Sequence, residues 1–238
     1  MTQVLVKCLC LALVPCAATA VAAPSASHPA VSHPVALFLD FDHSPSPVIV
    51  AGMKTEVQRI FSTSGLQFEW HMLAEPSRGS EFATLAVIHV KGECSVPSLL
   101  PAGDDLGGAA LASTPVSGGN ILHFTDLECS RVGEYIAPLL SGSPQSIREQ
   151  VLGRAMGRIL AHELYHIFTG NQQHADGGIA RSFHRRQELV APRFDFEAAE
   201  SEEFRDFRAA MEPAARPEEP NPGIDVPVPD DGVSSAGR

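Results

Sequence analysis

Two histidines and a glutamate stand at a spacing that can bind and use a metal ion. His162 and His166 are four residues apart, so on a helix their rings project from one face, about one turn apart. At that separation two imidazole nitrogens can reach one Zn²⁺ ion at about 2.0–2.1 Å. Glu163 follows the first histidine, so its carboxylate lies beside the metal, where it can take a proton from a water molecule and pass it to a leaving amine. The segment therefore predicts a hydrolytic zinc site.

A catalytic zinc ion takes three protein ligands and keeps one position open. His174 lies eight residues beyond His166, after a predicted helix end at Gly170, so a returning loop can bring its ring to the metal. We take His174 as the expected third ligand. Glu188 is an alternative, because two histidines followed at this distance by a glutamate resemble the gluzincin metallopeptidases. Two further candidates are Asp176 and His184.

The pattern from His162 to His174 resembles the extended zinc motif of the metzincin metallopeptidases. In that family a third histidine follows the second by six residues, after a glycine turn. Here the spacing is eight and the glycine is Gly170, so the turn is two residues longer. Metzincins also carry a methionine turn beneath the metal, and the corresponding position here is Ala180. The chain is therefore similar to a divergent, bacterial metzincin-like branch.

This resemblance implies both a fold and a set of roles. The fold would be α/β, a mixed sheet with a long active-site helix and a small, irregular C-terminal subdomain. His162, His166 and His174 would bind Zn²⁺, and Glu163 would be the general base that acts on a peptide or protein substrate. An extended substrate would pair with the sheet edge formed by the short strand predicted at residues 109–114.

The hydrophobic pattern predicts the elements that position these residues. Strands are expected at residues 35–41, 66–72, 83–90, 109–114 and 120–124, and helices at 48–64, 127–140, 144–168, 185–190 and 197–211. Residues 83–90 are apolar almost throughout, which predicts an interior strand covered on both faces. Ser146 and Glu149 have capping-box spacing at the start of the long helix, and Gly170 ends it. Gly153 and Gly157 within it would let a neighbouring strand or helix approach closely behind the metal site.

The N-terminus has the pattern of an export signal. Residues 1–23 combine Lys7, an apolar run and small residues near the expected cleavage point, which predicts a signal peptide and a secreted or periplasmic protein. The apolar run is too short for a transmembrane helix. An uncleaved N-terminal anchor is the alternative. Residues 24–34 would form a leader, 35–213 the metallopeptidase-like domain, and 214–238 a disordered tail rich in acidic residues and proline.

Charge and cysteine content restrict the partners and the compartment. The formal net charge is −11 over 238 residues, which argues against nucleic acid and anionic membranes as partners. Three of the five cysteines fall within the predicted signal peptide. The remaining pair, Cys94 and Cys129, could form one disulfide in an oxidising compartment or remain two buried thiols.

Together these features predict a secreted, zinc-dependent metallopeptidase that hydrolyses peptide bonds. A protein of another class remains as the alternative, namely a non-catalytic, exported zinc-binding or structural protein that retains the metal site. The longer turn after His166 and the alanine at position 180 are the features that motivate this alternative.

Overall fold

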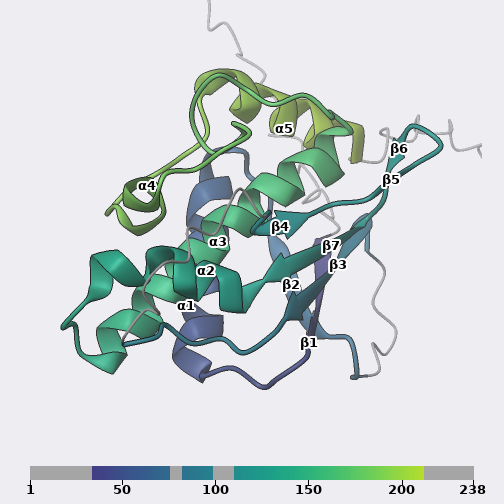
Figure 1. Ribbon diagram of the computed structural model, residues 1–238. Coiled ribbons are helices and arrows are strands. Elements are labelled where there is room, and N and C mark those ends of the chain that lie inside the picture. Colours follow the sequence, from purple (N-terminus) through teal and green to yellow (C-terminus); the bar gives the residue numbers. More distant parts are fainter. Residues whose placement is uncertain (1–33, 76–81, 99–109, 212–238) are drawn as a thin grey trace, which may run out of the picture. The chain divides into compact units, whose positions relative to one another are not determined.

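The computed structural model describes residues 34–75, 82–98 and 110–211. Within these residues the fold is α/β, with a mixed sheet and several helices (Figure 1). The predicted signal peptide, the leader apart from its last residue, and the predicted tail lie outside the described residues. None of the described helices is both long enough and apolar enough to cross a membrane.

Five strands form the main sheet. In spatial order they are β2 (Phe68–Met72), β1 (Val35–Phe41), β3 (Thr84–Lys91), β7 (Phe124–Glu128) and β4 (Ala112–Ser113). The first four strands are parallel, and β4 is an antiparallel strand at the edge. A separate hairpin pairs β5 (Val116–Ser117) with β6 (Asn120–Ile121). Because β4 ends near this hairpin and the long helix, the sheet edge lies beside the site described below.

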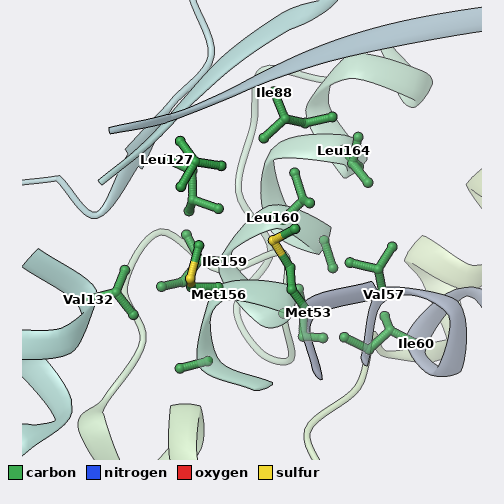
Figure 2. Packing of buried hydrophobic residues seen from close by; sticks show 14 of the residues in the cluster. Met53, Val57, Ile60, Ile88, Leu127, Val132, Met156, Ile159, Leu160 and Leu164 are labelled. Carbon is green, nitrogen blue, oxygen red and sulfur yellow. The ribbon is translucent and has the colours of Figure 1, made fainter. Parts of the chain in front are cut away.

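Most of the core lies between one face of this sheet and two helices. The helical elements are α1 (Pro47–Ile60), a 3₁₀ turn (Phe61–Thr63), α2 (Cys129–Ile136), a second 3₁₀ turn (Ala137–Leu140), α3 (Gln145–Thr169), α4 (Arg186–Val190) and α5 (Ala198–Met211). Figure 2 shows Met53 and Val57 of α1 facing Met156 and Leu160 of α3, beneath the strand residue Ile88. These apolar side chains are almost fully buried, and their burial is the main force that fixes α3 against the sheet.

Strand β3 corrects one expectation from the sequence. Ala86, Ile88 and Val90 are fully buried, but Leu85 is exposed and His89 is only half-buried. The strand is therefore covered on one face, not on both. The helices pack on the face that holds the buried residues, whereas the other face carries polar contacts such as that of His89 with the Asp42 carboxylate at 2.9 Å.

The two glycines of α3 allow α1 to approach closely, as predicted. A Cβ atom on Gly153 would lie 2.5 Å from the carbonyl oxygen of Ile49. A Cβ atom on Gly157 would lie 2.7 Å from the Cβ of Glu56. Any larger residue would have to push the two helices apart, because interiors are close-packed.

Two predictions, about the start of α2 and the start of α3, are wrong. Residues 127 and 128 continue strand β7, so the helix predicted from residue 127 begins only at Cys129. The predicted capping box is absent from α3, whose N-cap is Pro144. Glu149 instead accepts hydrogen bonds from Ser46, at the start of α1, and from Gln145. A contact with a distant segment has replaced the local one.

The two cysteines predicted to remain in the mature chain form a disulfide. Cys94 follows β3 and Cys129 opens α2, and their Cα atoms are 5.0 Å apart. The bond closes a loop with a sequence separation of 35 residues. Cross-linking a loop of this size restricts the unfolded chain and stabilises the native state by about 3–4 kcal/mol.

Replacing both cysteines by serine is therefore expected to lower the free energy of unfolding by about 3–4 kcal/mol. Urea denaturation followed by circular dichroism under non-reducing conditions measures this change. Wild-type protein reduced with dithiothreitol is the matched control and should lose a similar amount. Equal midpoints for oxidised and reduced wild-type protein would show that the cross-link does not contribute.

Candidate metal centre

The first two predicted ligands and the predicted base lie on the buried half of α3. His162, Glu163 and His166 are each 7–8% exposed, because the loop after the helix covers them. The helix ends where the sequence predicted: Gly170 has a left-handed φ of 68° and its N–H donates to the carbonyl oxygen of His166 at 3.0 Å. This conformation, which favours glycine, turns the chain back toward the two histidines.

The returning loop brings His174 to the pair. The ring centroids of His162 and His166 are 4.7 Å apart, and that of His174 lies 5.2 Å from the first and 4.9 Å from the second. One nitrogen from each of the three rings lies within 4.8 Å of the others, so the group can hold a metal ion. His174 is exposed at the surface, whereas its two partners are buried.

Backbone carbonyls fix the orientation of the two helical imidazoles. Nδ1 of His162 lies 2.8 Å from the carbonyl oxygen of Ile179, and Nδ1 of His166 lies 2.7 Å from that of Asn171. A carbonyl oxygen only accepts, so in each ring Nδ1 must carry the hydrogen and Nε2 the lone pair. Such bonds to the second nitrogen are typical of metal-bound histidine.

The two Nε2 atoms face each other at 3.1 Å. With both Nδ1 atoms protonated, this contact brings two lone pairs together, which is unfavourable unless a cation lies between them. Three imidazole donors also suit a transition-metal ion. The residues present therefore fit a metal ion.

Burial keeps His162 and His166 neutral. Removal from water, together with the nearby imidazoles, lowers the pKa of His162 to about 3, while the hydrogen bond to the carbonyl oxygen of Ile179 acts in the opposite direction. Burial also lowers the pKa of His166. Neutral imidazole is the form that binds metals, so protons do not compete for these two nitrogens near pH 7.

Glu163 is held by the edge of the sheet. The hydroxyl of Thr114, the residue after β4, donates to Oε2 of Glu163 at 2.6 Å. Burial raises the pKa of the Glu163 carboxyl group, while the bond from Thr114 acts in the opposite direction. A buried carboxylate beside a three-imidazole group is an arrangement able to move protons at a metal site.

No known protein family, no curated protein and no solved structure matches this chain.

The alternative third ligands from the sequence lie outside the group of three. Glu188 pairs with the Arg181 side chain and accepts from the backbone N–H of Arg185. His184 uses Nε2 to donate to the carbonyl oxygen of Ile179 at 2.8 Å, the same oxygen that fixes His162. Asp176 is exposed on the loop. Ala180, at the predicted position of the methionine turn, is fully buried.

Three supporting groups were not found from the sequence: Thr114 and the backbone carbonyls of Asn171 and Ile179. Asn171 is itself fixed, since its Nδ2 donates to the hydroxyl of Tyr165 at 2.8 Å. Tyr165 is also 2% exposed, so it packs under the helix and, through Asn171, supports the site. Backbone carbonyls have no residue signature, and the only sequence signal for Thr114 was its place at the end of a predicted edge strand.

A cavity of about 850 Å³ opens in front of the three histidines. It is lined by residues 110–114, which include the edge strand β4, and by Ile159 and Glu163 of α3. Residues 182–187 and Tyr135 of α2 line it as well. The site is therefore a groove lined by the edge strand, by α3 with two of the candidate metal ligands, and by the segment at the start of α4.

Proposed function

We propose that the chain is an exported, zinc-dependent metallopeptidase of the metzincin-like type. The observation that carries the proposal is the convergence of His162, His166 and His174. The Nε2 atoms of His162 and His166 are 3.1 Å apart, and Glu163 is buried beside them. This combination of three imidazole donors and one adjacent carboxylate is what hydrolysis by a zinc enzyme requires.

Zinc is the proposed metal, because it is commonly bound by imidazole nitrogens and suits a hydrolytic site with three histidines. Structural zinc sites have four protein ligands, whereas catalytic sites have three and keep one position open. His162, His166 and His174 would hold the ion, and the groove in front of them would admit substrate. When bound, zinc supplies a Lewis acid that polarises a carbonyl group and makes a coordinated water molecule more acidic.

Glu163 is the proposed general base. Its raised pKa brings the carboxylate closer to the working pH, where proton transfer in both directions is efficient. The hydrogen bond from Thr114 occupies Oε2 and leaves Oε1 for the reacting water. Glu163 would take the proton from that water and then deliver it to the nitrogen of the leaving amine.

The edge strand supports a peptide as the substrate. Among the described residues β4 pairs only with β7, on one side, and its residues line the groove that holds the histidines. A free strand edge binds an extended peptide through main-chain hydrogen bonds. The antiparallel edge strand, the mixed sheet and the long helix also support the metzincin-like assignment.

Export is supported by two independent features. The predicted signal peptide at residues 1–23 would direct the chain out of the cytosol. The disulfide between Cys94 and Cys129 would persist in an oxidising compartment.

Metal analysis combined with digestion of casein and of a peptide library tests the proposal. We expect about one zinc ion per chain, because one three-histidine group is available. Cleavage should be lost with 1,10-phenanthroline and restored by added zinc. Stoichiometric zinc without chelator-sensitive cleavage would instead support the non-catalytic zinc protein that the longer turn and Ala180 suggest.

A further inference from the structure

One arginine that lines the groove has no ion-pair partner among the residues that the structure describes. Arg186 begins α4 and lines the groove, and its guanidinium carbon lies 4.8 Å from the centre of the Tyr135 ring. The Nε atom of Arg186 is buried and, among the residues that the structure describes, has no hydrogen-bond partner. An unmatched buried donor on a cation is costly, so such a group calls for an anionic partner.

The other buried or half-buried arginines around the site have a carboxylate or carbonyl partner, although Nη2 of Arg158 is also buried without a hydrogen-bond partner among the described residues. Arg158 and Arg59 both pair with the Glu56 carboxylate. Arg181 pairs with Glu188. Within the described part of the chain Arg186 forms no ion pair, although the chain as a whole carries a net charge of −11 and has many carboxylates to offer.

Two arginines line the groove. They are Arg185 and Arg186, and the only carboxylate among the described lining residues is that of Glu163. A carboxylate entering from solvent therefore finds two arginine side chains among those that line the groove. The stacking contact with Tyr135 restrains Arg186. The N–H groups in the plane of the guanidinium can then donate two parallel hydrogen bonds to one carboxylate.

Tyr135 links Arg186 to the metal ligands. Its hydroxyl donates to the carbonyl oxygen of His184 at 3.0 Å, and the His184 ring lies 5.3 Å from the ring of His162.

A peptide paired with β4 would extend the sheet, and its side chains would point alternately to the two faces of the sheet. Every second side chain would then lie on the face that α3 covers, and α3 and Arg186 line the same groove.

We propose that Arg186, stacked on Tyr135, binds a carboxylate of the substrate, so that the preferred substrates carry this group close to the bond that is cut. This inference rests on the proposed peptidase function and names its substrate class. The carboxylate can belong to an aspartate or glutamate side chain or to the C-terminus of the peptide, and the geometry of a planar fork suits both.

Cleavage of matched peptides tests the inference. The library contains N-acetylated, C-amidated peptides in pairs that differ only by glutamate or glutamine, together with the same sequences ending in a free carboxylate. We expect wild-type protein to favour acidic peptides by about 10- to 100-fold in kcat/KM, the range for a hydrogen bond to a charged group. A preference confined to free C-termini would assign the carboxylate to the chain end, and one confined to glutamate would assign it to a side chain.

Variants of Arg186 and of a control arginine distinguish a loss of carboxylate recognition from a general loss of cleavage. Arg186→Gln should abolish the preference for acidic peptides. Arg186→Lys should retain part of it, because lysine keeps the positive charge but lacks the paired N–H donors of the guanidinium. Arg193→Gln is the matched control, since Arg193 is exposed and does not line the groove. Equal cleavage of both members of each pair by wild-type protein would overturn the inference while leaving the peptidase function intact.

A binding measurement covers the case in which no peptide is cleaved. Fluorescence anisotropy with labelled peptides compares Glu163→Gln protein with the double variant that also carries Arg186→Gln, each with and without zinc. Tighter binding of acidic peptides that depends on Arg186 would support the carboxylate site even if the proposed catalytic function fails. Equal binding of acidic and amide peptides would reject the site.

Discussion

Replacing Glu163 by glutamine is expected to slow peptide hydrolysis by about 10²- to 10⁴-fold, the usual contribution of a general acid–base group. Glutamine has nearly the same shape and can still accept the hydrogen bond that Thr114 donates to Oε2. Its amide cannot take a proton from water near pH 7. The zinc content should stay at the wild-type value, because Glu163 is not among the three residues that could hold the ion.

The measurement is steady-state cleavage of one quenched fluorescent peptide, with zinc quantified in the same samples. Glu134→Gln is the matched control, since Glu134 is exposed on α2 and lies outside the groove. It should leave both rate and zinc content unchanged. Full activity in Glu163→Gln would remove this residue as the base, and a parallel loss of zinc would show that it acts through the metal site's structure.

The parts of the site that could be predicted from the sequence are local. The four-residue interval between His162 and His166 places both rings on one face of any helix. The left-handed conformation of Gly170 follows from the absence of a Cβ atom. Because both features depend on neighbouring residues, the turn toward His174 could be predicted without a tertiary structure.

The parts that could not be predicted depend on contacts between distant segments. Thr114 and Glu163 are 49 residues apart, and no spacing rule relates them. The carbonyl oxygen of Ile179 accepts from both His162 and His184, and a carbonyl is present at every position of the chain. That Arg186 has no ion pair among the described residues is equally invisible in the sequence, because pairing depends on which carboxylates the fold brings near.

The same distinction explains the errors in secondary structure. Leu127 was assigned to a helix with the apolar residues that follow it, yet it is fully buried within β7. The pairing of β7 with β3 and β4 decided its conformation, and local periodicity cannot report such pairing. Ser146 and Glu149 had the spacing of a capping box, but the contact of Glu149 with Ser46 took precedence.

Loss of the exposed ligand candidate His174 is the second change with a large expected effect, on zinc affinity and on cleavage. His174→Ala is expected to lower zinc affinity by more than about 100-fold, since loss of a group that only hydrogen-bonds to a metal ligand already costs about 10- to 100-fold and loss of a ligand costs more. The two helical imidazoles would remain in place, each held by its carbonyl bond, but two nitrogens do not complete a catalytic zinc site. Peptide cleavage should fall to background at zinc concentrations that saturate the wild-type protein.

His184→Ala is the comparison that tests the choice of third ligand. His184 is close to His162 but uses Nε2 to donate to Ile179, so its loss should weaken zinc binding by no more than about 10- to 100-fold. Competition with a chromophoric chelator gives both affinities, and cobalt substitution reports the coordination through its visible spectrum. A chain that keeps zinc without His174 and loses it without His184 would contradict the assignment, because the loop after Gly170 would then deliver a different imidazole to the metal.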